Sequence, residues 1–226
     1  MKLGIYAAAI VASTNPTLAA AFEFGGASLE YSYRDAEFNS QQQLSGSAAF
    51  SFGNAFGAEV GLKHAIYDNG LISNGGEVHL TYGFGGGFTL GVFYGGETFD
   101  TDNYQYYGTE AAFVTGSFAA QTSISRYHGD SYDATNFTLD GEYSFGDQFG
   151  VLAGYHNVND ATDSTNYLFA GASYSFAPSF AVKATYGRLD YNSGTDDTVA
   201  TLGLTYNFGG GATFNQRTYT EILPTD

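Results

Sequence analysis

Residues 137–149 read FTLDGEYSFGDQF, and this stretch decides the fold. Apolar or small residues at one parity (Phe137, Leu139, Gly141, Tyr143, Phe145) alternate with polar residues at the other (Thr138, Asp140, Glu142, Ser144). Successive side chains of a strand point to opposite faces, so the alternation predicts a β-strand with one apolar and one polar face. Residues 146–148 then form a short turn, and Phe149 opens the next strand.

The same phrase recurs about every thirty residues, which indicates one supersecondary unit copied along the chain. Copies of its turn lie at residues 50–56, 82–88, 143–149 and 174–180, a degenerate copy lies at 114–118, and residues 206–209 close the series. The repeated unit is a β-hairpin. It predicts twelve strands, at residues 22–34, 43–52, 56–67, 76–84, 88–97, 104–114, 118–127, 135–145, 149–157, 166–176, 180–190 and 198–208.

The N-terminus predicts export. Lys2 precedes an apolar run over residues 3–12, and Ala19-Ala20-Ala21 supplies small residues for cleavage, so residues 1–21 are predicted to be a signal peptide. The apolar run is too short to cross a bilayer as a helix. We therefore expect a barrel domain over residues 22–208, with residues 209–226 as a C-terminal tail or an additional strand.

Charge and cysteine content exclude several classes of protein. The net charge of −16 disfavours nucleic acid as a partner, because phosphates are repelled. The chain has no cysteine, so it is no disulfide-stapled secreted domain. Many acids fall between the hairpins, which predicts longer, acidic loops at one end of the sheet and short turns at the other.

Alternation alone leaves a secreted, soluble β-sandwich open. The aromatic residues beside the short turns favour a membrane barrel, because they would form one ring at a common depth, as in an interfacial girdle. The predicted girdle consists of Phe52, Phe56, Phe84, Phe88, Phe118, Phe145, Phe149, Phe176, Phe180 and Phe208. The sequence thus predicts an all-β, antiparallel, up-and-down transmembrane barrel of the outer-membrane type, with short periplasmic turns and longer acidic extracellular loops.

Strand endings such as Tyr143-Ser144-Phe145-Gly146 and Tyr206-Asn207-Phe208, with tyrosine-rich strands and acidic loops, resemble those of Gram-negative outer-membrane porins of the alpha-proteobacterial type. The resemblance implies a passive channel for small hydrophilic solutes or cations. It also implies contact with outer-membrane lipid and lipopolysaccharide, and assembly by the barrel-assembly machinery. Two features depart from the family pattern: no loop is long enough to fold into the pore as a constriction, and residues 209–226 follow the final aromatic strand end.

Parity places a set of charged residues on the inner face, and these are the predicted pore lining: Glu30, Arg34, Glu59, Lys63, Glu77, Glu97, Glu110, Asp140, Glu142 and Lys183. They are either a salt-bridged network that satisfies charges in a filled barrel or an acidic lining that attracts cations. Small inward residues predict space for water. Large inward residues (Tyr67, Phe93, Tyr127, Tyr167, Phe169) predict a constriction.

Two other functions remain open on the sequence alone. One is a structural or surface-interaction barrel with a plugged lumen. The other is an outer-membrane enzyme, for which His64 and His128 are the candidates, although neither belongs to a recognisable catalytic motif. No histidine has metal-ligand spacing, and we expect no metal site and no cofactor. Acidic loop pairs leave the binding of divalent cations open.

Overall fold

The computed structural model describes residues 22–36, 40–53, 55–129, 133–161, 163–192, 194, 196–209 and 213–214. The predicted signal peptide lies outside these residues. The strands are β1 (Phe22–Asp35), β2 (Gln41–Phe52), β3 (Phe56–Tyr67), β4 (Ile72–Gly85), β5 (Phe88–Phe99), β6 (Asp102–Thr115), β7 (Phe118–Gly129), β8 (Asp133–Phe145), β9 (Phe149–Asp160), β10 (Ser164–Ala177), β11 (Phe180–Tyr191) and β12 (Asp196–Gly209). Over the described residues, no helix has the length and apolar character that a membrane crossing requires.

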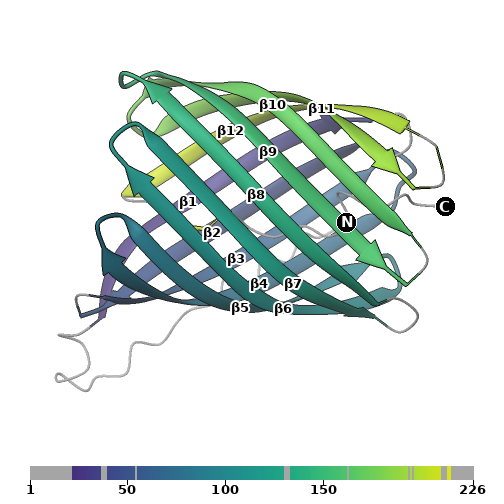
Figure 1. Ribbon diagram of the computed structural model, residues 1–226, viewed down its shortest axis with the longest axis horizontal. Coiled ribbons are helices and arrows are strands. Elements are labelled where there is room, and N and C mark those ends of the chain that lie inside the picture. The colour runs from purple at the N-terminus through teal and green to yellow at the C-terminus, as the bar shows by residue number, and fades with distance from the viewer. Residues whose placement is uncertain are drawn as a thin grey trace, which may run out of the picture.

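Every strand pairs with its neighbours in the chain, and β1 pairs with β12, so the sheet closes into a barrel (Figure 1). All pairings are antiparallel; at the closure, for example, Glu30 lies opposite Thr205. Closure leaves no open sheet edge, which lipid demands because hydrocarbon offers no hydrogen-bond partners. The predicted twelve-strand, up-and-down barrel is confirmed.

The strands are longer at the loop end than the sequence pattern predicted. β4 begins at Ile72 rather than residue 76, and Asp102 and Asp133, predicted in loops, are the first residues of their strands. The connections at this end are correspondingly short. The shortest comprises residues 100–101, and the longest comprises residues 36–40. Backbone pairing continues past the point where one face is apolar, so the alternation ends before the strand does. The expectation of longer loops is not confirmed in detail, because most of these connections exceed the turns at the other end by only one or two residues.

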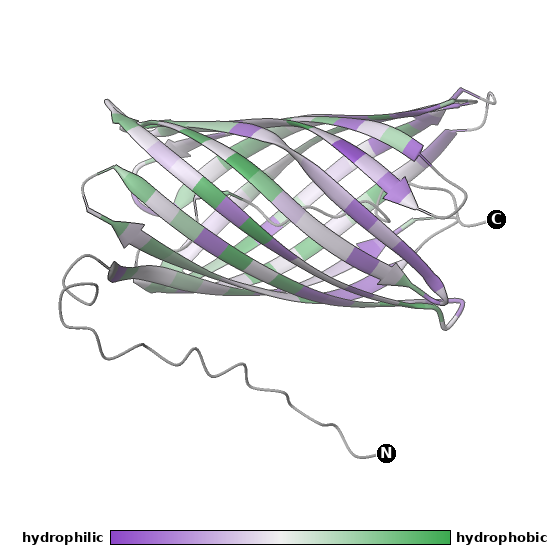
Figure 2. Cartoon of the chain, turned by 90° about the horizontal axis from the view of Figure 1, so that it is seen from below, coloured by the Kyte–Doolittle hydropathy of each residue, from purple (hydrophilic) through white to green (hydrophobic). Residues whose placement is uncertain are grey.

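Several acids at this end have local structural partners. The Asp160 carboxylate accepts the backbone N–H of Asp163 at 2.6 Å, which closes the β9–β10 connection. Arg188 contacts Asp196 at 2.5 Å across β11 and β12. Asp197, also predicted in a loop, is buried on the inner face of β12. In Figure 2 hydrophilic residues gather at this end of the barrel.

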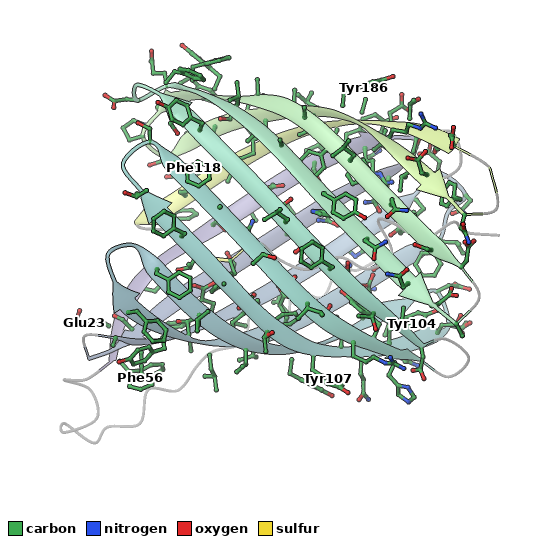
Figure 3. The ribbon with its side chains drawn as sticks, in the orientation of Figure 1. Glu23, Phe56, Tyr104, Tyr107, Phe118 and Tyr186 are labelled. Carbon is green, nitrogen blue, oxygen red and sulfur yellow. The ribbon has the colours of Figure 1, made fainter. Side chains whose placement is uncertain are left out.

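The outer surface is apolar. Leu62, Leu80 and Leu168 are each at least 60% exposed, and Figure 3 shows Phe56, Tyr107 and Tyr186 directed away from the barrel. Such exposure of large side chains is unfavourable in water and favourable against acyl chains. The outward position of the apolar parity is therefore what an outer-membrane barrel requires.

Two aromatic belts lie at different depths on this surface. The predicted girdle phenylalanines are all exposed beside the turns and form the phenylalanine belt, in which pairs such as Phe84–Phe88 (5.7 Å) and Phe176–Phe180 (5.6 Å) face each other across one turn. Tyrosines toward the loop end form a second belt. Their hydroxyls donate to amides on the next strand, as in Tyr31–Gln42 (3.2 Å), Tyr94–Gln105 (3.1 Å) and Tyr155–Asn166 (2.7 Å). The membrane-interface role of the phenylalanine belt stays a prediction.

Candidate functional site

The barrel interior has two unlike sides. Inward residues of β3–β7 are mostly buried, and we call this side the packed wall. Inward residues of β8–β12, β1 and β2 are mostly of intermediate exposure over the half near the turns, and we call this side the hydrated wall. Solvent therefore reaches the second side over the half near the turns.

All residues predicted to line the pore lie on the inner face, although the two walls hold them differently. Buried are Arg34, Glu59, Lys63, Glu77, Glu97 and Glu110; partly exposed are Glu30, Asp140, Glu142 and Lys183. Except for Arg34, the buried members belong to the packed wall and the accessible members to the hydrated wall. Their function as a pore lining stays a prediction.

The packed wall contains a fully buried ion pair. Lys63 Nζ lies 2.7 Å from Glu97 Oε1, and both side chains have no exposed surface. The Ser73 hydroxyl donates to the same carboxylate oxygen at 2.5 Å. The three residues belong to β3, β4 and β5, so one charge pair ties three neighbouring strands together. Buried charges persist only when they are paired and hydrogen-bonded in this way.

His79 occupies the centre of the packed wall. Its Nδ1 lies 2.6 Å from Glu110 Oε1 and its Nε2 lies 3.2 Å from Glu77 Oε1. An imidazolium offers a donor to each carboxylate, so His79 compensates part of their negative charge. The sequence placed His79 on the polar face without including it among the site residues. Its position between Glu77 and Thr81 at the same parity is the signal that marks it as inward-facing.

Glycines explain how large side chains lie flat against the wall. Gly91 stands opposite Glu110, and a Cβ on Gly91 would lie 2.6 Å from the Glu110 carboxylate. Gly154 stands opposite Asp140, where a Cβ would lie 2.5 Å from a carboxylate oxygen. The absence of a glycine side chain thus admits the partner across the strand, rather than leaving an open space as the sequence interpretation assumed.

An aromatic and aliphatic cluster fills part of the lumen. Tyr106 and Tyr127 stack with ring centroids 4.9 Å apart, and Phe93 joins them. Further buried members come from β8, β9, β11 and β12, including Val158, Leu189 and Val199. The predicted inward positions of Phe93 and Tyr127 agree with this cluster. Tyr106 was not recognised as inward, although counting back from Glu110 by twos reaches it.

The hydrated wall holds carboxylates that solvent can reach. Asp140 pairs with His156 at 2.8 Å, and the two side chains remain 19% and 21% exposed. Glu142 accepts a hydrogen bond from Ser173 at 2.6 Å, and Glu30 accepts one from Thr205 at 3.1 Å. Lys183 on β11 is the one lysine among the described inward residues of this wall. The accessible charge is therefore predominantly negative.

The histidines considered for catalysis lie outside the lumen. His64 faces outward and hydrogen-bonds Asn74 at 2.9 Å, and His128 is exposed beside Asp133 at 2.5 Å. Across the described ranges, no three histidine or carboxylate side chains gather in a geometry that would hold a metal ion. The arrangement inside the barrel suits the passage of polar solutes past fixed charges.

Comparison with known proteins agrees with this geometry. The Gram-negative porin family matches residues 74–222, about two thirds of the chain. No curated protein matches. Among solved structures, the KdgM porin in complex with disordered oligogalacturonate is similar with a TM-score of 0.59 at 16% identity, covering 79% of this chain and 98% of that one. The CymD monoaromatic hydrocarbon channel is similar with a TM-score of 0.55 at 11% identity, covering 86% and 90%. At these identities the structural likeness concerns the fold.

Proposed function

Since the chain belongs to the Gram-negative porin family and is a passive diffusion channel of the outer membrane, we propose that the channel prefers cations and that the hydrated wall sets this preference. The observation that carries the proposal is the accessible charge of this wall. Glu30, Asp140 and Glu142 are partly exposed on this wall, where Lys183 is the partly exposed cation and Arg34 is buried. Fixed negative charge raises the local cation concentration and lowers that of anions.

The packed wall contributes less to selectivity than its acid content suggests. Lys63 lies against Glu97, and His79 lies between Glu77 and Glu110. These carboxylates are buried and compensated, so permeating ions experience a weaker field from them than from the accessible carboxylates. The two interpretations of the charged residues, a structural network and an acidic lining, thus apply to opposite walls of one barrel.

The proposed solutes are small and hydrophilic, with neutral and cationic solutes favoured over polyanions. KdgM was solved with an oligogalacturonate, which is a chain of acidic sugars. We propose that the present barrel does not favour such an acidic solute, because the carboxylates of the solute would be repelled by the carboxylates of the hydrated wall. Outer-membrane lipid, lipopolysaccharide and the barrel-assembly machinery are proposed as partners. Support comes from the exposed aromatic belts and from the aromatic end of β12 at Phe208.

Planar-bilayer recording tests the proposal. Under a KCl gradient, the refolded protein is expected to give a reversal potential of the sign that indicates cation permeation. Anion preference would contradict it. A second candidate, a plugged structural barrel, is favoured by the buried cluster around Tyr106, Tyr127 and Leu189. That candidate would be supported by correctly folded protein that fails to conduct.

A further inference from the structure

Glu59 is a buried carboxylate near the turn end of β3. Its two oxygens accept hydrogen bonds from the backbone of a distant segment of the chain. Thr213 N–H donates to Oε1 at 2.8 Å, and Phe214 N–H donates to Oε2 at 3.1 Å. Both donors come after β12. Two successive backbone N–H groups directed at one carboxylate make a charge-assisted pair, which is stronger than a neutral contact.

The side chain of Phe214 has its own place beside this carboxylate. It is 3% exposed, and its ring lies parallel to the imidazole of His79, with an interplanar angle of 2° and centroids 6.1 Å apart. His79 stands directly opposite Glu59 in the β3–β4 register. One cross-strand pair thus supplies both a hydrogen-bond acceptor for the backbone and a flat surface for the ring.

Chain geometry requires the segment to enter from the turn end. β12 ends at Gly209, which is paired with Gly26 and has φ of +73°. Between Gly209 and Thr213 the chain reaches at most about 14 Å. Glu59 lies about 10 Å along β3 from Phe56, at the same end of the barrel. Gly209 has a left-handed backbone, where a side chain would be strained.

Burial of Glu59 is understandable only with these donors. A carboxylate removed from water is unfavourable unless hydrogen bonds replace its hydration. Among the described residues, the hydrogen bonds to the Glu59 side chain are those from Thr213 and Phe214. The two partners therefore complement each other. The segment supplies two backbone donors from outside the strands, and the wall supplies a carboxylate that has no other hydrogen-bond donor among the described residues.

We propose that Glu59 and His79 form an internal binding site for the chain's own Thr213–Phe214 segment, and that this tethered segment narrows the channel and withholds the Glu59 carboxylate from permeating ions. The proposal rests on the channel function proposed above. A twelve-stranded barrel has a backbone radius of about 11–12 Å, and side chains leave a free radius of about 6–7 Å. A chain segment with its side chains takes roughly half of that cross-section.

Deletion of residues 210–226 is the direct test, with single-channel recording of the refolded barrel. We expect conductance to rise about twofold, from the cross-section argument. We also expect the cation preference to increase, because Glu59 becomes accessible. Refolding is established first by circular dichroism and by heat-dependent migration in electrophoresis. Unchanged conductance of the folded, truncated barrel would overturn the proposal.

Two point variants in the complete chain separate the two effects. Phe214→Ala removes the ring and is expected to raise both conductance and cation preference. Glu59→Gln places an amide NH₂ group against one backbone donor; it is expected to raise conductance without increasing the cation preference. Glu142→Gln on the opposite wall is the matched control, expected to lower the cation preference without raising conductance. Equal conductance in Phe214→Ala, Glu59→Gln and the parent would refute the docking site.

The outcomes distinguish this inference from the proposed function. Higher conductance of the truncated barrel with anion preference would support the docked segment and overturn the proposed selectivity. Cation-selective conductance that is identical with and without residues 210–226 would support the proposed selectivity and overturn the docked segment. Absence of conductance in both folded forms would overturn both.

Discussion

Glu142 gives the sharpest test of how this channel selects ions. Its carboxylate is partly exposed on β8 and accepts a hydrogen bond from the uncharged Ser173 hydroxyl, whereas Asp140 has His156 as a neighbour. Replacement by glutamine keeps the shape and removes one uncompensated charge. We expect Glu142→Gln to lower the ratio of cation to anion permeability.

The magnitude follows from the barrel dimensions. With a backbone radius of about 11–12 Å and a side chain reaching about 5 Å inward, the carboxylate lies about 6 Å from an ion on the axis. The Coulomb energy at that distance in water is about 0.7 kcal/mol. Screening at 0.1 M salt leaves about 0.4 kcal/mol, a factor of about two for each ion sign. The permeability ratio therefore falls about fourfold.

Reversal potentials across planar bilayers measure this ratio. At 1 M salt the same energy is below about 0.1 kcal/mol, so the effect of Glu142→Gln should nearly vanish. Asp196→Asn provides the control, because Asp196 lies exposed at the rim and pairs with Arg188. An unchanged ratio at 0.1 M, or an equal change at both salt concentrations, would refute the assignment of selectivity to the hydrated wall.

Further predictions concern stability and insertion. Lys63→Met leaves the buried Glu97 carboxylate without its cation and should lower the free energy of unfolding by about 3–5 kcal/mol, measured by urea titration in lipid vesicles. Adding Glu97→Gln to Lys63→Met should recover most of that loss. A Lys63→Met variant as stable as the parent would contradict a stabilising Lys63–Glu97 ion pair. Leu80→Arg on the outer face should cost about 2–4 kcal/mol in the same titration, whereas the inward Thr81→Arg should cost less. Replacement of both Phe84 and Phe88 by alanine should slow insertion of the barrel into vesicles, as measured by heat-dependent migration in electrophoresis. An unchanged insertion rate would show that the phenylalanine belt does not assist assembly.

The sequence contained enough to predict the barrel. Alternation fixes which face of each strand is apolar, and the recurring short turns fix which strands are neighbours, so residues 137–149 already imply a hairpin with one oily face. It did not contain the ends of the strands at the loop side. Beyond the apolar band both faces are polar, and pairing such as Thr98 with Asn103 is decided by the backbone rather than by hydrophobicity.

The division of the lumen into two walls was equally beyond the sequence pattern. Parity places Glu110 and Glu142 on the same inner face, yet one is buried and the other accessible. The difference depends on what each side chain reaches across the strands: Glu110 passes over Gly91 to His79, whereas Glu142 passes over Gly150 to the Ser173 hydroxyl. Those neighbours follow from the register of several strands at once. The docking of Phe214 on His79 is a contact between distant segments, which no local pattern encodes.

The two walls explain how a barrel of this width can be both stable and conducting. A twelve-stranded barrel is too wide for a single layer of side chains to fill from all sides and too narrow to tolerate large side chains standing upright around its whole circumference. Glycines such as Gly91 and Gly95 let Glu110 and Tyr106 lie along one wall, where buried pairing stabilises the strands. The opposite wall keeps smaller residues and few accessible charges. Net charge along the lumen is therefore a poor guide to selectivity: a charge that holds strands together is compensated by its partner, and only a charge that solvent can reach acts on a passing ion.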